Sequence, residues 1–172
     1  MASAAELEQM AEHVRYEVDE LRKALQKLSK LKKEDSDWNA AIESFLLHFR
    51  NLRAFFFAEG NNDDDVLAKH YVAGWNPTKD CVFDNTRVDI NKRLAHLTAW
   101  RLKTFNHGWP VKNMWEAIEE LVSEFKKSLP APQTGWFSGL AERPVILVLG
   151  VENYSTCSTS SPSTITYLLP GT

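Results

Sequence analysis

The sequence of 172 residues contains few glycines and prolines, with seven of each. Strand-rich folds need many tight turns, and tight turns depend on these two residue types. Their scarcity therefore favours a helical protein, and the length suits one domain with a useful core. The sequence also lacks a run of about 18 apolar residues, and it begins without the basic and apolar stretches of a secretory signal. We expect no membrane span and a cytoplasmic protein.

An excess of positive charge is missing too, since the formal net charge is −3. Binding nucleic acid over a whole surface needs a dominant positive field, so that class is disfavoured, although a local basic strip remains open. The two cysteines, Cys81 and Cys157, form no CxxC pair and no Cys/His group with zinc spacing. We expect two free thiols in a reducing compartment, and no metal or cofactor.

The familiar catalytic signatures are absent as well. The chain has no GxSxG, no P-loop, no HExxH and no Gly-rich dinucleotide turn. These absences favour a non-enzymatic module and leave catalysis open.

What the sequence does contain is a set of helical patterns. Four long helices are predicted, and a shorter one over 66–72 precedes the third. The long helices cover residues 4–33, 37–58, 84 or 86 to 106, and 111–128. The first carries a stripe of apolar residues at spacings of three and four, which predicts packing inside a bundle or, alternatively, a dimeric coiled coil. The stripe consists of Leu7, Ala11, Val14, Val18, Leu21, Leu25 and Leu28.

The second predicted helix is apolar around most of its circumference. Phe45, Phe49, Leu52 and Phe56 fall on one side, and further apolar residues spread over much of the rest. Such a helix is touched by several neighbours, so we expect it to be central. The fourth helix has a single apolar face that consists of Met114, Ile118, Leu121, Val122 and Phe125.

Together these patterns predict an all-α, up-and-down four-helix bundle over residues 1–130. An irregular or partly disordered tail should follow over residues 131–172, because the composition changes after Pro132. Trp136 and Phe137 are candidates to fold back on the bundle. The runs at 145–151 and 164–169 suit strands of a small β-hairpin, as an alternative to disorder.

Polar residues inside the apolar helices define the candidate site. On the third helix, Ile90, Leu94, Leu97 and Phe105 form the apolar side, and Asn91, Thr98 and Arg101 project to that side, where unpaired polar groups are costly. His96 points the other way. The second helix adds His48 and Asn51. The candidate binding residues are His48, Asn51, Asn91, Lys92, His96 and Thr98.

The search for a site should therefore begin where the second and third helices meet. The alternative is a structural role, with His48 a satisfied histidine at the core margin and with Glu43, Arg50 and Arg53 solvated or paired. The third helix also carries a positive strip that can bind phosphate or an acidic partner, or pair with acidic neighbours. Against Asp89 alone, the strip holds Arg87, Lys92, Arg93, Arg101 and Lys103.

Two blocks, ESFLLHFRNL within residues 43–56 and INKRLAHLT within residues 90–101, resemble helical-bundle proteins of bacteria that have no assigned activity. More distantly, the chain resembles the HEPN superfamily, many of whose members are dimeric, metal-independent ribonucleases of toxin or defence systems. Their site is an Arg and a His separated by four to six residues, which Arg101 and His107 match with five between them. Leu102 departs from the polar residue usual after the Arg.

The HEPN resemblance implies RNA cleavage, in which His107 would move a proton and Arg101 would stabilise the developing charge. The favoured expectation is a non-enzymatic binding or interaction module that binds a protein or a small acidic ligand, and that forms a homodimer. A HEPN-like RNA-binding protein or ribonuclease is the alternative.

Overall fold

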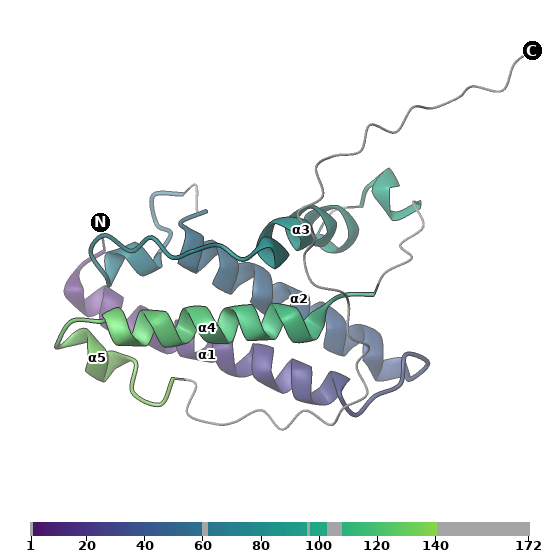
Figure 1. The fold of residues 1–172 in the computed structure, drawn as a ribbon, viewed down its shortest axis with the longest axis horizontal. Coiled ribbons are helices and arrows are strands. Elements are labelled where there is room, and N and C mark those ends of the chain that lie inside the picture. The colour runs from purple at the N-terminus through teal and green to yellow at the C-terminus, as the bar shows by residue number, and fades with distance from the viewer. Residues whose placement is uncertain (1, 60–61, 96, 103–107, 141–172) are drawn as a thin grey trace, which may run out of the picture.

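The computed structural model of the chain describes residues 2–59, 62–95, 97–102 and 108–140, without the side chains at 85, 95, 100 and 101. The described residues are mainly helical and include no strand, so the all-α prediction is confirmed. Three long helices lie side by side, and shorter helices cover one side and one end (Figure 1). In chain order the elements are α1 (Ala4–Leu28), α2 (Ser36–Phe57), η1 (Ala68–His70), α3 (Cys81–Asp89), η2 (Ile90–Ala95), η3 (Ala99–Leu102), α4 (Val111–Ser128) and α5 (Gln133–Trp136).

Helix α1 begins with a reciprocal cap. The backbone N–H of Glu6 donates to Ser3 Oγ at 3.3 Å, and the Ser3 N–H donates to Glu6 Oε2 at 2.7 Å. This pairing satisfies two amides that have no partner inside the helix. The predicted apolar stripe is buried from Ala11 to Leu28 within the chain, and α2 is its main neighbour. The alternative of packing inside the bundle is therefore observed, and the coiled-coil argument for a dimer loses its basis.

Helix α2 is the central helix, as its aromatic pattern predicted. Phe45, Phe49 and Phe56 are at most 1% exposed. Phe55 lies on another side of the helix and meets Phe125 of α4 edge to face, with ring centroids 5.5 Å apart. The helix ends where Ala58 takes a left-handed conformation, with φ 52°, and this turn places the following residue, Glu59, beside the helix end.

Two of the three long helices run in the same direction, and the third runs opposite to them. Helix α1 runs antiparallel to α2, whereas α4 runs parallel to α2 (Figure 1). Phe125, in the last turns of α4, accordingly contacts Phe55 and Phe56 in the last turns of α2. The return leg between α2 and α4 consists of an extended connection followed by α3 and η2, so a helix fills only its second half.

Aromatic rings close the end of the molecule where α2 and α4 finish. Phe125 lies edge-on to Tyr71, Trp75 and Phe137, with centroid distances of 6.1, 5.4 and 5.1 Å. Phe137 is 1% exposed, so the prediction that this part of the tail folds back on the bundle is confirmed. Burial raises the pKa of Tyr71 to about 12, and its hydroxyl donates to the Leu7 carbonyl.

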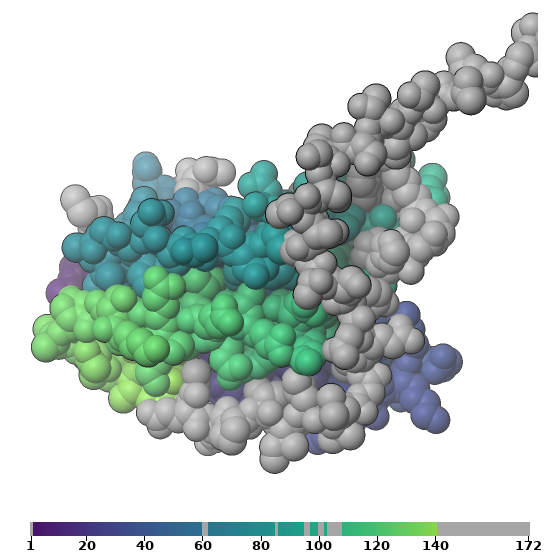
Figure 2. All heavy atoms as spheres, in the orientation of Figure 1, coloured from purple at the N-terminus to yellow at the C-terminus, as the bar shows by residue number. Residues whose placement is uncertain are grey.

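The space-filling view in Figure 2 shows the face of the molecule on which α4 lies in the middle, between the α3 side and α5.

The third long helix was predicted wrongly. Regular helix begins at Cys81, where Asp80 Oδ1 accepts the Val82 N–H at 2.7 Å, and it ends at Asp89. A π-helical turn follows, and a 3₁₀ turn comes after a break. Thr98 Oγ1 donates to the Lys92 carbonyl at 2.7 Å and so competes with the backbone bond of a continuing helix. Leu97, assigned to the apolar side, is 92% exposed.

Two other predictions concern short elements. The helix expected over 66–72 is a 3₁₀ turn, Ala68–His70. The strand-like runs at 145–151 and 164–169 lie outside the described residues. None of the helices described combines the length and the apolarity that crossing a bilayer requires.

Candidate functional site

A cleft of about 320 Å³ opens between α2 and the α3–η2 segment. It lies where the helix of His48 meets the segment of Asn91, which is the place that the sequence indicated. Its lining carries three positive charges and one negative charge. The lining residues are Arg50, Arg53, Ala54, Glu59, Arg87, Ile90 and Asn91.

Helical spacing explains why the lining residues of each wall lie on one face of their element. On α2, Arg53 and Ala54 follow Arg50 by three and four residues, which places all three on one face. Arg87, Ile90 and Asn91 have the same spacing across the junction of α3 and η2. Ile90 is 2% exposed, so it fixes this second wall against the core.

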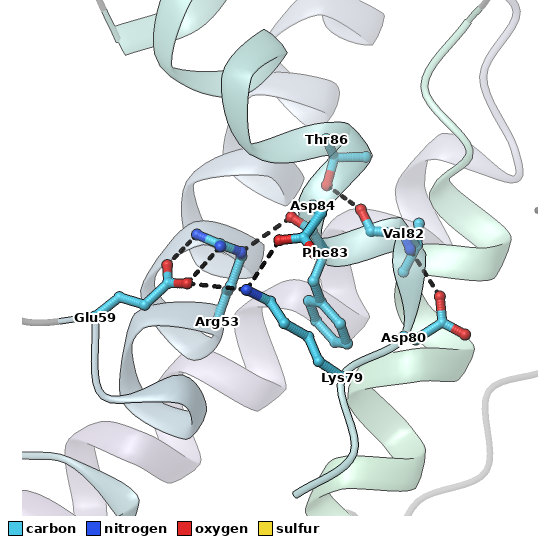
Figure 3. Close-up of polar contacts among 8 residues, drawn as sticks. All are labelled: Arg53, Glu59, Lys79, Asp80, Val82, Phe83, Asp84 and Thr86. Atoms are coloured by element: carbon cyan, nitrogen blue, oxygen red, sulfur yellow. Dashed lines mark hydrogen bonds and ion pairs between the residues drawn. The ribbon is translucent and has the colours of Figure 1, made fainter. Parts of the chain in front are cut away.

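Arg53 is the buried charge of the cleft, with 5% of its surface exposed. Its Nε donates to the Phe83 carbonyl of α3 at 3.0 Å. Its two terminal nitrogens bind the two carboxylate oxygens of Glu59, and Nη2 donates to Oε1 at 2.5 Å (Figure 3). Such a bidentate ion pair fixes the orientation of both side chains, and the hydrogen bond to the Phe83 carbonyl links α2 to α3.

Lys79 extends this pair into a chain of alternating charges. Its Nζ lies 3.2 Å from Glu59 Oε1 and 2.9 Å from Asp84 Oδ1, as Figure 3 shows. The hydrogen bond from Lys79 holds the pKa of the Asp84 carboxyl below its usual value. Arg53, Glu59, Lys79 and Asp84 therefore balance one another, and Glu59 has both oxygens engaged.

The pKa of Arg53 is lower than that of a free arginine, and both burial and nearby charges contribute. Burial lowers this pKa first, because it disfavours the charged form, and Glu59 opposes that effect. The positive charge of Arg87 lowers it further. Arg87 is thus close enough to repel Arg53, although the two residues come from different elements.

Arg50 and Arg87 are the unpaired arginines of the cleft. Asp84, three residues before Arg87, is close enough for the Arg87 charge to lower its pKa, but Lys79 is the group that binds it. Both arginines are exposed. Neither makes a hydrogen bond or an ion pair with any residue that the structure describes. Arg50 has no acidic residue three or four positions away on α2, so local pairing along the helix is ruled out by the sequence itself. The cleft therefore presents two free guanidinium groups next to a third that is already paired.

Two of the predicted binding residues lie on a different face of α2. His48 Nδ1 lies 2.8 Å from Glu17 Oε2 of α1, and Asn51 Nδ2 donates to the same oxygen at 3.1 Å. His48 is 8% exposed and meets the Tyr16 ring edge to face. These contacts join α1 to α2, which is the structural alternative considered for His48.

The remaining predicted residues are spread along the third segment. Asn91 lines the cleft, and Lys92 is exposed. Thr98 bonds to the Lys92 carbonyl, and Arg93 Nε pairs with Asp89 Oδ1 at 2.9 Å. His96, Lys103, His107 and the Arg101 side chain lie outside the described residues.

Cys81, the first residue of α3, is disulfide-bonded. The prediction of two free thiols is therefore wrong for this residue, and the part of the chain that the structure describes contains no free cysteine. The argument for a reducing compartment, which rested on free thiols, loses its support. Cys157 lies outside the described residues.

Comparison with known proteins gives no relative. No protein-family model, no curated protein and no solved structure matches the chain. The chemistry of the cleft is therefore the basis for a functional proposal.

Proposed function

We propose that the protein is a helical binding module that takes a small anionic ligand in the cleft between α2 and the α3–η2 segment. The observation that carries this proposal is the pair of unpaired arginines, Arg50 and Arg87, beside the paired Arg53. Like charges that converge repel one another, and an anion relieves that repulsion. The guanidinium group is planar, always charged and well matched to carboxylate and phosphate oxygens.

Binding fits the lining better than catalysis does. Among the residues that the structure describes, the lining includes no histidine, cysteine, serine or tyrosine, which are the usual nucleophiles and proton carriers. Its one carboxylate, Glu59, is held by Arg53 and Lys79. A bound anion would therefore be positioned without a group ready to attack it.

We also infer that the fold is an up-and-down four-helix arrangement whose third leg is only half helical. The antiparallel run of α2 on α1 and the parallel run of α4 and α2 support this topology. It matters for the site because the extended half of the third leg leads into Lys79 and Asp80, which start α3 at the cleft.

Replacement of the two free arginines tests the proposed function. The probes are inorganic phosphate, sulfate and citrate at pH 7.5, followed by calorimetric titration. We expect at least one of them to bind the wild-type chain, and Arg50→Gln and Arg87→Gln to weaken it by about tenfold each, the effect of one lost charge-assisted hydrogen bond. Both residues are exposed, so circular dichroism should show an unchanged fold.

Arg15→Gln is the charge control, because it removes an arginine from α1, away from the cleft; since Arg15 also donates to the Ser138 carbonyl and pairs with Glu12, circular dichroism should confirm its fold too. It should bind the probe as the wild type does. The proposal is wrong if none of the three anions binds, or if the double variant Arg50→Gln, Arg87→Gln binds as tightly as the control.

A further inference from the structure

The charge balance of the cleft narrows the class of ligand, in an inference that rests on the proposed function. We propose that the ligand is a phosphate monoester, bound as its dianion, with a small and partly apolar body. Arg50 and Arg87 hold the phosphate group, and Ala54 faces the body.

The free charges of the cleft match a dianion. Glu59 neutralises Arg53 through both of its oxygens, and Lys79 shares its charge with Asp84. Two positive charges are left, those of Arg50 and Arg87. A phosphate monoester carries a charge of about −1.5 to −2 at pH 7, which matches them. A carboxylate, a sulfate ester or a phosphodiester carries one charge and leaves one arginine uncompensated.

The hydrogen-bond donors of the cleft suit a group with three terminal oxygens. Arg50 comes from α2 and Arg87 from α3, so two guanidinium groups approach the cleft from separate walls. Asn91 lies one turn after Arg87 and adds an amide donor. A monoester has three terminal oxygens to accept from these groups, whereas a diester has two and covers the rest of its phosphorus with substituents.

The size of the cleft limits the body of the ligand. A volume of 320 Å³ lies at the small end of the range for ligand sites. Ala54, which is partly exposed, adds apolar surface beside the arginines, and the buried Ile90 backs the opposite wall. Such a cleft suits one charged group and a compact body better than a length of polymer.

The test compares 4-nitrophenyl phosphate with 4-nitrophenyl sulfate, which share their shape and body but differ in charge. At pH 7.5 we expect the phosphate to bind the wild-type chain about tenfold more tightly, the value of one further charge-assisted hydrogen bond. In Arg87→Gln this preference should shrink to about twofold, and in Arg15→Gln it should persist. No 4-nitrophenolate should be released.

The pH dependence of the preference adds a second readout. The second ionisation of a phosphate monoester lies near pH 6, and the nitrophenyl group lowers it for this probe, so the two affinities should converge as the pH falls through that ionisation and the phosphate becomes a monoanion like the sulfate. The charged groups that the structure describes at the cleft are arginines, Lys79, Glu59 and Asp84, and no histidine is among the described lining residues. We therefore expect the loss of preference at low pH to come from the ligand. The phosphate affinity should fall as the pH drops, and the sulfate affinity should not.

The outcomes separate this inference from the proposed function. If phosphate and sulfate bind equally at pH 7.5, and both are lost in the double variant, then the cleft binds anions but not monoesters in particular. If bis(4-nitrophenyl) phosphate binds more tightly than the monoester, a nucleic-acid backbone becomes the better ligand and the monoester inference is overturned. If no probe binds, both proposals fail.

Discussion

Arg53 is the residue on which the shape of the cleft depends most. It is almost fully buried, and it bonds both Glu59 and the Phe83 carbonyl. A buried charge without a partner is strongly unfavourable, because the protein interior solvates it poorly. Glu59 therefore has a structural task, which also leaves it unable to neutralise Arg50 or Arg87.

Removal of the Glu59 charge tests this task at the residue scale. Glu59→Gln should lower the free energy of unfolding by about 2–3 kcal/mol, since it leaves Arg53 buried and underpaired. Urea unfolding measures the change. Glu43→Gln, on the exposed face of α2, is the control and should stay within about 0.5 kcal/mol of the wild type. Equal stability of the two variants would show that the Arg53–Glu59 pair does not support the fold.

Individual site residues were only partly predictable from the sequence. Asn91 was singled out and does line the cleft, because its helical side was read correctly up to η2. His48 and Asn51 were assigned to the same site, but Glu17 of α1 holds them on another face. Arg50 and Arg53 do carry a signal in the sequence. They lie in the aromatic-rich half of α2, and neither has an acidic residue three or four positions away.

At the element scale, the segment from Asp80 to Leu102 decides where the second wall of the cleft lies. Its only fully regular part is α3, which is nine residues long and begins at the Asp80 cap. So short a helix is marginal without its cap and its packing. The cap therefore positions Arg87, two turns further along, toward the cleft.

Replacement of Asp80 tests that positioning. Asp80→Ala should reduce stability by about 1 kcal/mol, because the Val82 amide loses its acceptor. Asp80→Asn keeps an acceptor and should change stability by only a few tenths of that amount. Amide hydrogen exchange at residues 82–84 should be faster in Asp80→Ala than in Asp80→Asn. Identical exchange in the two variants would mean that the cap does not hold the start of α3.

The elements that the sequence predicts best are those in which the apolar spacing and the flanking residues give the same helix limits. Helix α4 has the predicted limits, 111–128, because Pro110 precedes a single clear apolar face and Pro130 follows it. The third helix was extended too far because apolar residues keep helical spacing through Leu97. Periodicity could not reveal that α3 gives way to a π-helical turn after Asp89, or that the Thr98 hydroxyl donates to the Lys92 carbonyl beyond that turn.

For the molecule as a whole, the cleft results from how two elements far apart in sequence meet. Arg50 and Arg87 are 37 positions apart, and the Arg53 bond to Phe83 brings their elements together. A chain with a formal net charge of −3 thus carries a local positive site. At physiological salt, the electric field of exposed charges is screened within about 8 Å. An anion is therefore expected to respond to the arginines of the cleft and not to the negative charge of the whole chain.

The measurement that tests the central claim most directly is a titration of the arginine side-chain Nε–H signals by nuclear magnetic resonance, with 4-nitrophenyl phosphate at pH 7.5. The signals of Arg50 and Arg87 should shift together along one saturating curve, while that of Arg15 stays in place. The account is contradicted if the Arg50 and Arg87 signals do not move at saturating probe, or if the shifts are confined to arginines outside the cleft.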